Sequence, residues 1–253
     1  MTDPIVELLL ATADDDFVLG YRDSEWTGVA PMLEEDVAMS SISQDELGHA
    51  RVLYELALQT MGQDPTDSRR LDALAYARPL DCYRCCRLVE RHRGDWAFTI
   101  ARRYLYETAD DVRTEALAQS SLQPLANVIA KIRREERYHL LHLEVWFDRL
   151  ASSDESRPRL LAALENVWPD ALGFWESTCG EDDLIRSGVT AESSAALGER
   201  WLAEATSRFA SLGIEPPQSA ARTGGRQGER SPEFHELWAE ATEVYRQDPD
   251  ASW

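Results

Sequence analysis

The hydrophobic residues of this chain recur every three or four positions, and almost no segment shows the alternation typical of a β-strand. This period predicts an all-α protein. We expect helices at about 4–24, 32–61, 95–120, 124–151, 158–177, 191–211 and 232–246. Asp95 is suited to cap the third helix and Pro124 to begin the fourth, whereas Pro169 interrupts the fifth. Residues 62–70 are expected to form a loop, and residues 71–94 are less regular.

These helices predict a single domain over residues 1–253. Its core bundle is expected at about 4–151, followed by a C-terminal helical extension at about 152–253. A segment rich in glycine and proline at 214–232 precedes the last helix, and we interpret it as a flexible surface loop.

The charge of the chain is strongly acidic, with 46 Asp and Glu against 26 Lys and Arg and a net charge of −20. Such a surface repels nucleic acid and anionic lipid, so neither is an expected partner. Lys131 is the only lysine, which fits either a protein adapted to high salt or a generally acidic protein. The N-terminus lacks the features of a signal peptide and no apolar run reaches membrane length, so a cytoplasmic location is expected.

Four cysteines give little indication of chemistry. Cys82, Cys85 and Cys86 include one CxxC spacing, but Cys179 stands alone and no second pair or nearby histidine completes a zinc site. Reduced thiols are therefore expected.

Two short polar motifs interrupt the apolar stripes of the second and fourth helices. Glu46 and His49 lie three positions apart in ISQDELGHAR, and Glu136 and His139 repeat this spacing in EERYH. Residues at i and i+3 share one helix face, and here that face continues with apolar side chains. A buried carboxylate requires a compensating charge. One such motif alone fits a solvated surface equally well, but two on separate helices indicate an internal cation.

Two further carboxylates complete a set. Asp16 precedes Glu46 by thirty residues and lies on the apolar face of the first helix, although either of the two preceding aspartates is an alternative. Glu107 on the third helix precedes Glu136 by twenty-nine residues. The order carboxylate, ExxH, carboxylate, ExxH is that of the di-iron carboxylate proteins with a ferritin-like four-helix bundle.

The predicted metal ligands are therefore Asp16, Glu46, His49, Glu107, Glu136 and His139. Four carboxylates balance the charge of two divalent ions, and two iron ions are the natural choice, with manganese an alternative because it uses the same ligands.

Several neighbours of these ligands have an ordinary interpretation beside a functional one. Asp45, Asp110 and His142 could orient ligating side chains, and a surface position is the alternative for each. Tyr104 and Tyr138 are expected in the core rather than in an electron relay.

The residues also resemble a known family. The chain resembles the ferritin-like subunits of the phenylacetyl-CoA oxygenase (ring 1,2-epoxidase) complex, and it is most similar to the C-type subunit. The similarity is found in the stretch VLGYRDSEWTGVAPMLEEDVAMSSISQDELGHAR, the EERYH motif, RTGG at 222–225 and the terminal Trp253. The resemblance extends along the whole chain. It implies a multisubunit monooxygenase with a paralogous ferritin-like subunit, a reductase and an aromatic acyl-CoA substrate.

The resemblance also implies a division of roles within that family. The A-type subunit carries the di-iron site, and the C-type subunit has lost metal ligands. This chain departs from the C-type pattern because it retains all six. The predicted function is a di-iron oxygenase component. The alternatives are a non-catalytic structural subunit and a ferritin- or rubrerythrin-like iron oxidase. The arginines of RTGGRQGER could contact CoA phosphates or a partner subunit, with a flexible loop as the alternative.

Overall fold

The computed structural model describes residues 3–249, which form helices joined by turns and loops with no strand among them. The predicted all-α, ferritin-like fold class is confirmed. The described chain divides into two compact units, one made of residues 3–92, 178–180 and 224–249, and the other of residues 93–177 and 181–223. Each unit contains one pair of long helices.

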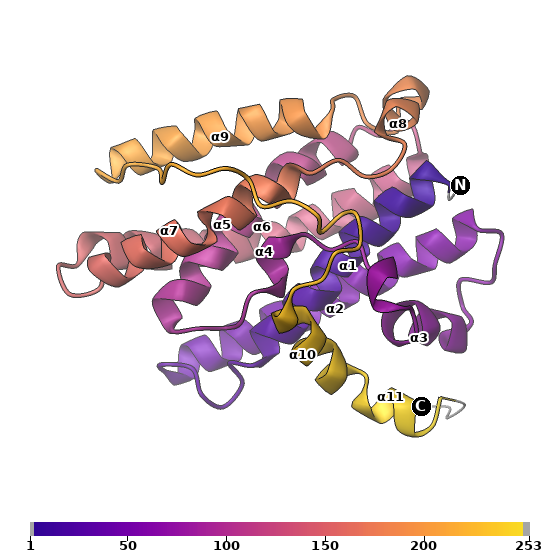
Figure 1. The fold of residues 1–253 in the computed structure, drawn as a ribbon, viewed down its shortest axis with the longest axis horizontal. Coiled ribbons are helices and arrows are strands. Elements are labelled where there is room, and N and C mark those ends of the chain that lie inside the picture. The colour runs from indigo at the N-terminus through magenta and orange to yellow at the C-terminus, as the bar shows by residue number, and fades with distance from the viewer. Residues whose placement is uncertain (1–2, 250–253) are drawn as a thin grey trace. The chain divides into compact units, whose positions relative to one another are not determined.

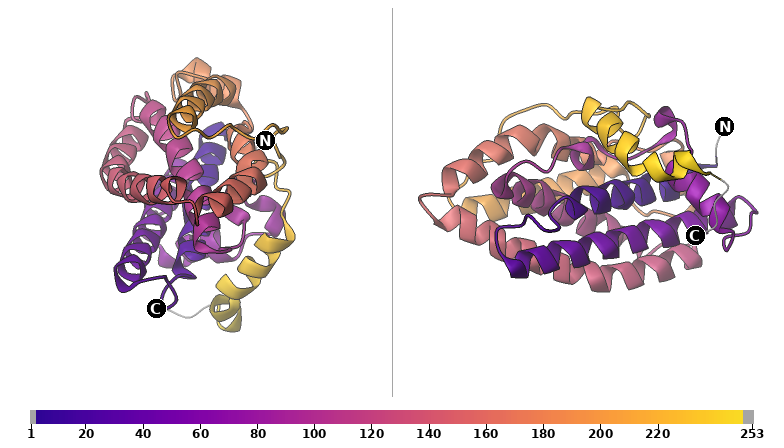
Figure 2. Two further views of the ribbon diagram at one scale, coloured as in Figure 1. Left: turned by 90° about the vertical axis from the view of Figure 1, so that its left-hand side faces the viewer. Right: turned by 90° about the horizontal axis from the view of Figure 1, so that it is seen from below.

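The first unit is built on the pair α1 and α2, which lie side by side in Figures 1 and 2. Shorter helices from the middle and from the end of the chain complete it. Its elements are α1 (Pro4–Ser24), α2 (Leu33–Thr60), α3 (Ser68–Tyr76), a 3₁₀ turn (Leu80–Cys82), α4 (Arg87–Glu90), α10 (Pro232–Ala241) and α11 (Glu243–Gln247).

A glycine allows α1 and α2 to approach closely. A Cβ atom on Gly20 would lie 2.8 Å from the Leu47 side chain, closer than real Cβ contacts allow. The hydroxyl of Ser43 donates a hydrogen bond of 2.7 Å to the Gly20 carbonyl oxygen, which joins the two helices at this point. The close contact holds the two helices together along their buried faces.

Helix α1 is buried on almost every side, and its charged residues have partners within the unit. The Asp14 carboxylate accepts hydrogen bonds from the Tyr54 hydroxyl (2.6 Å) and the Arg84 backbone N–H (2.6 Å), and it pairs with Arg78. Burial and the neighbouring Asp14 charge raise the pKa of Tyr54 well above its usual value. Tyr54 therefore acts here as a hydrogen-bond donor.

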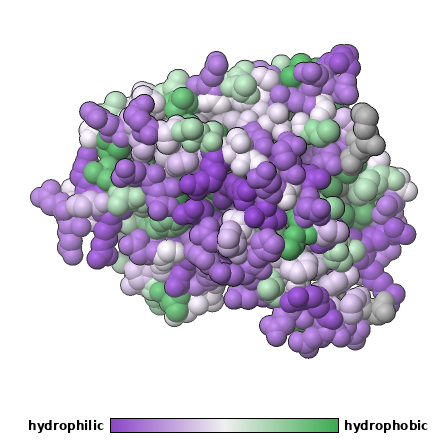
Figure 3. Space-filling model, in the orientation of Figure 1, coloured by the Kyte–Doolittle hydropathy of each residue, from purple (hydrophilic) through white to green (hydrophobic). Residues whose placement is uncertain are grey.

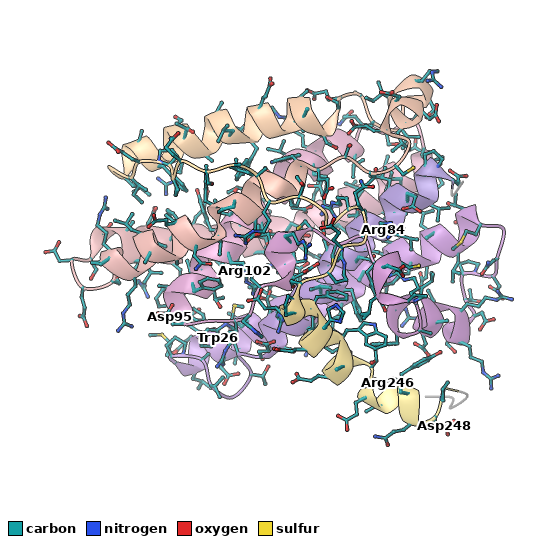
Figure 4. The ribbon with its side chains drawn as sticks, in the orientation of Figure 1. Trp26, Arg84, Asp95, Arg102, Arg246 and Asp248 are labelled. Carbon is teal, nitrogen blue, oxygen red and sulfur yellow. The ribbon has the colours of Figure 1, made fainter. Side chains whose placement is uncertain are left out.

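The segment that follows Gly224 is held against α1 and α4. The Arg226 guanidinium binds both oxygens of Asp15 at 2.8 Å and donates to the carbonyl oxygen of Arg84 at 2.9 Å. The location of Arg84 beside α1 is labelled in Figure 4. Arg230 pairs at 2.7 Å with Glu90, whose carboxylate is fully buried. These bonds turn the end of the chain into part of the core of the first unit.

The expectation of a flexible surface loop is therefore wrong for this part of the chain. Gly225 is buried, and a Cβ atom there would lie 2.7 Å from the carbonyl oxygen of Cys85. Arg226 and Arg230 are bound to the protein's own carboxylates, so they are not offered to CoA phosphates. Arg222 pairs with Asp170 at 2.9 Å in the second unit.

The second unit is built on the pair α5 and α6, with α7 and α9 packed on α5. Asp95 caps α5 by accepting a hydrogen bond of 2.8 Å from the Phe98 N–H, as predicted, and Figure 4 labels this residue. Pro124 lies in the first turn of α6, as predicted. The elements are α5 (Trp96–Leu117), α6 (Gln123–Ser152), α7 (Arg157–Leu172), a 3₁₀ turn (Gly173–Trp175), α8 (Glu181–Ser187) and α9 (Ser194–Ser211).

Aromatic side chains form the centre of this second unit. The ring of Tyr104 stacks on Phe147 with 4.1 Å between ring centroids, and Phe147 stacks on Phe209 of α9. The prediction of a core position for Tyr104 is confirmed. Tyr138 is instead 73% exposed, so the same prediction is wrong for this residue.

The sequence predicted the long helices well and the short ones less well. The helices α3 and α8 were not predicted, and α3 begins at Ser68, inside the expected loop. The last helix is divided at Thr242, whose hydroxyl donates to the Trp238 carbonyl oxygen at 2.6 Å. Pro169 lies inside α7, which continues to Leu172.

Among the described residues, no helix is both long and apolar enough to cross a membrane. The face of the molecule shown in Figure 3 is mostly hydrophilic, and its apolar side chains form small separate areas. Where several exposed apolar residues lie on one helix face, they mark a candidate binding surface.

We expect the substitution Arg226→Met to destabilise the protein by about 3–5 kcal/mol, because it leaves the buried carboxylate of Asp15 without its cation. Chemical denaturation measures this change. Arg186→Met is the matched control, because Arg186 pairs with Asp183 at the surface, and we expect it to change the stability by less than about 0.5 kcal/mol. Equal effects of the two substitutions would contradict the role of Arg226.

Candidate metal centre

The first unit brings three of the predicted ligands together. Asp16 of α1 and Glu46 and His49 of α2 each offer one donor atom, and these atoms all lie within 4.8 Å of one another. All three side chains are buried. We call this group the first half-site.

The apolar pattern of α2 is what turns these side chains inward. Met39, Ile42 and Leu53 lie on the same face as Glu46 and His49, and all five are buried, as the sequence predicted. The stripe must face the protein interior to remove its apolar surface from water, and the two polar residues follow it because they share its helical period. The half-site is therefore a consequence of how α2 packs.

The spacing of the donor atoms suits a metal ion. The Nδ1 atom of His49 lies 4.0 Å from a carboxylate oxygen of Glu46, which is too long for a hydrogen bond. Nitrogen and oxygen ligands of a divalent ion lie at about 2.0–2.2 Å from the metal, so two ligands of one ion are separated by up to roughly 4 Å. One imidazole and two carboxylates form a donor set that iron and manganese accept.

The second unit brings together the other three predicted ligands. Glu107 of α5 and Glu136 and His139 of α6 each offer a donor atom, again within 4.8 Å of one another and again buried. The Nδ1 atom of His139 lies 3.2 Å from Glu136 and 3.9 Å from Glu107. We call this group the second half-site. Its donor set repeats that of the first half-site, with glutamate in the place of Asp16.

The second half-site contains a cation that sequence reasoning missed. The Arg103 guanidinium donates a hydrogen bond to the same Glu107 oxygen that faces His139. Both side chains of this ion pair are almost completely buried. The signal in the sequence was the position of Arg103 four residues before Glu107, which places the two on one face of α5.

The three consecutive aspartates of α1 are all buried, but only one of them belongs to the half-site. Asp14 and Asp15 are bound by arginines, whereas Asp16 lies with Glu46 and His49. The sequence left open which of these aspartates faces the interior. In the structure all three do, and each lies beside a different neighbour.

Three other residues are candidates for groups that orient the ligands. Asp110 is buried and pairs with Arg113 on the same helix, so the alternative of a surface position is wrong for it. Asp45 and His142 are half-buried. That any of the three orients a ligating side chain stays a prediction. The cysteines are free thiols, and none of those in the described chain belongs to a metal-binding group. Burial raises the pKa of the Cys85 thiol well above its usual value, so this thiol is protonated.

A cavity of about 340 Å³ lies in the first unit beside α1, α2 and α3. Its wall includes the rings of Phe17, Tyr54 and Tyr76, with Leu47 and Ala50 of α2. Phe17 and Leu47 follow Asp16 and Glu46 directly in the chain. The wall also contains the polar residues Arg51, Ser68 and Asp72, and none of the predicted ligands lines it.

The fold and the two half-sites can be compared with known proteins. A family model described as phenylacetic acid catabolic protein matches residues 1–253. The chain belongs to this family. The resemblance that the sequence motifs indicated is thereby confirmed.

A relative within this family indicates which type of subunit the chain resembles. The C-type subunit of the 1,2-phenylacetyl-CoA epoxidase of Escherichia coli (strain K12) is 30% identical to this chain over 246 residues. The matched region covers 96% of this chain and 97% of the relative. The similarity to a C-type subunit, which the sequence motifs indicated, is also borne out.

If the half-sites bind divalent ions, Fe²⁺ or Mn²⁺ will stabilise the folded protein. At a free ion concentration of 100 times the Kd each bound ion contributes about 2.7 kcal/mol, so two ions contribute about 5.4 kcal/mol, which corresponds to a rise in Tm of roughly 10–20 °C for a chain of this length. Differential scanning calorimetry under anaerobic conditions measures the shift. The double variant Glu46→Gln, Glu136→Gln should lose it, and an equal shift in that variant would contradict binding at these residues.

Proposed function

We propose that this protein is the metal-binding component of a multisubunit oxygenase that epoxidises the ring of an aromatic acyl-CoA, using two iron ions held by the two half-sites. The observation that carries the proposal is the repeated donor set: each half-site has two carboxylates and one imidazole, buried and within 4.8 Å of one another. The function named for the Escherichia coli relative supports the substrate class.

The residues that would hold the ions have separate tasks. Glu46 with His49, and Glu136 with His139, would each bind one ion from a single helix face, while Asp16 and Glu107 would complete the sets from α1 and α5. Two ferrous ions in this place would supply the electrons and the binding position for dioxygen that an epoxidation requires. One oxygen atom of dioxygen enters the ring and the other leaves as water, so a separate reductase must supply two electrons for each turnover.

The surroundings of the half-sites would exclude water. The stripe on α6 that contains Glu136 and His139 continues with Ile129, Ile132 and Leu143, which are all buried. A dry site strengthens the interaction of carboxylates with a cation and protects a reactive species from side reactions. The cavity beside α1 and α2, with its aromatic wall, offers a position for the substrate ring.

A second candidate function is that of a metal-free partner subunit. The observation that favours it is the buried ion pair between Arg103 and Glu107, because an internal guanidinium already balances one carboxylate of the second half-site. The Escherichia coli relative is a C-type subunit, and its name is compatible with either role. Metal content distinguishes the two candidates directly.

We expect two iron ions per chain after anaerobic reconstitution with Fe²⁺ and removal of unbound metal, measured by elemental analysis and by the absorption spectrum after exposure to dioxygen. The variant Glu46→Gln, Glu136→Gln should bind no stoichiometric iron. Glu135→Gln is the matched control, since Glu135 adjoins Glu136 but lacks the i, i+3 relation to His139. Wild-type protein without bound iron would refute the metal-binding role and leave the partner-subunit role.

A second test addresses the reaction. Iron-loaded protein, combined with its reductase and partner subunits, should add one oxygen atom to phenylacetyl-CoA, as detected by mass spectrometry of the CoA thioester. The Glu46→Gln, Glu136→Gln variant in the same assembly should form no such product. Full activity of this variant would show that the oxygenase centre lies in another subunit.

The role of Arg103 gives a separate prediction. Substitution Arg103→Met removes the cation that competes for Glu107, and a charged hydrogen bond of this kind contributes about 1.5–3 kcal/mol, so the affinity of the second half-site for Fe²⁺ or Mn²⁺ should rise roughly tenfold or more. Titration followed by calorimetry measures it. Arg113→Met, which breaks a pair with Asp110 on the same helix, is the control and should leave the affinity unchanged. A lower affinity in Arg103→Met would show that Arg103 supports the site.

A further inference from the structure

A second cavity of the first unit lies between α1, α3, α10 and α11, and its volume is about 580 Å³. None of the proposed metal ligands lines it, so it has no part in either half-site. Its wall combines tyrosine rings with carboxylates, and the described residues that form this wall include no lysine, arginine or histidine. We call it the tyrosine cavity.

Three tyrosine rings form the aromatic part of the wall. Tyr76 of α3 stacks on Tyr245 of α11, with 5.9 Å between the ring centroids and 27° between the ring planes. The hydroxyl of Tyr21 on α1 donates a hydrogen bond of 3.2 Å to the Tyr76 hydroxyl. Burial raises the pKa of Tyr21 well above its usual value, so its side chain stays a neutral phenol. The face of such a ring carries negative partial charge, which attracts a cation.

Two carboxylates of the tyrosine cavity have no cation bound to them. Asp72 of α3 and Glu240 of α10 make no hydrogen bond and no ion pair with any residue between 3 and 249. Partial burial raises the pKa of Asp72, and the charge of Arg51 opposes this shift from a distance. The third carboxylate of the wall, Glu25, is bound by Arg22 at 2.7 Å. The cavity therefore offers two anionic groups to a ligand.

The remaining wall selects among cations. A metal ion requires several oxygen or nitrogen atoms close together, and the carboxylates of the tyrosine cavity do not form such a group in the described chain. Leu237, Ala241 and Val244 make the rest of the wall apolar. An alkylammonium ion meets both conditions, because its carbon atoms contact apolar groups and rings while its charge faces the carboxylates. The net charge of −20 raises the concentration of any cation near the protein.

We propose that the tyrosine cavity binds a small alkylammonium ion. The charged nitrogen lies among the tyrosine rings, beside the carboxylates of Asp72 and Glu240, and the alkyl groups contact the apolar part of the wall. Because α10 and α11 supply half of the wall, the ligand also ties the end of the chain to α1 and α3. The binding is independent of metal ions, since the two kinds of site share no residue.

Isothermal titration calorimetry of the full chain with choline tests the proposal. Choline should bind with a Kd of about millimolar order, as expected for so small a ligand. Its neutral analogue 3,3-dimethylbutan-1-ol has carbon in place of the charged nitrogen and the same shape. The analogue should bind at least about tenfold more weakly, because it lacks the attraction to the rings and to the carboxylates.

Two variants remove the two kinds of group in turn. Tyr245→Leu keeps an apolar side chain but removes one ring, and Asp72→Asn keeps the shape but removes one charge. Each should weaken choline binding about fivefold or more. Asp182→Asn is the matched control, since Asp182 is an exposed acid of α8 outside the cavity, and it should bind choline like the wild type. Circular dichroism establishes that the variants are folded.

The outcomes separate this proposal from the metal-binding role. The Glu46→Gln, Glu136→Gln chain should bind choline like the wild type, whatever its iron content. Absence of binding to the wild type, equal affinity for choline and its neutral analogue, or unchanged binding in both cavity variants would overturn the proposal. An equal loss in Asp182→Asn would also overturn it, because the cation would then be attracted only by the acidic surface as a whole.

Discussion

The arrangement of the first unit depends on how it compensates the free-energy cost of burying carboxylates. Helix α1 places three consecutive aspartates, Asp14, Asp15 and Asp16, in the interior, where an uncompensated charge costs many times the net stability of a protein. The first unit meets this cost for two of them with arginines from distant parts of the chain, Arg78 and Arg226. Asp16 lies with a second carboxylate and an imidazole, and the donor atoms of the three are buried within 4.8 Å of one another. This convergence of ligand atoms from two helices is the physical reason to propose a cation at that place.

The two half-sites offer equivalent donor atoms but differ in their electrostatics. In the second half-site, Arg103 already binds Glu107 and reduces the charge that a metal ion would have to balance. Removing one partner from a buried ion pair is costly, so a metal ion that takes Glu107 must either displace Arg103 to another acceptor or share the carboxylate with it. The affinity of the second half-site for a cation therefore depends on where the Arg103 guanidinium can move.

Much of the site could be predicted from the sequence, because Glu46, His49, Glu136 and His139 share the period of apolar stripes that must be buried. The long helices followed from the same pattern. The cation bound to Asp15 could not be predicted in this way, since Arg226 reaches it across more than two hundred residues and has no periodic signal. Short helices such as α3 and α8 were missed because two turns contain too few apolar positions to define a period. The buried end of the chain was missed because its many glycines are typical of a loop, whereas here they permit close contact with neighbouring backbone.

Helix α6 is subject to constraints on two opposite faces. Its inner face fixes Glu136 and His139 among apolar side chains, and its outer face presents Tyr138, Leu141 and Val145 to solvent. A group of exposed apolar side chains on one helix face is stabilised when a partner covers it and removes it from water. A partner on the outer face would therefore contact the same helix that holds Glu136 and His139 in the second half-site, and it would restrict the movement of these two side chains.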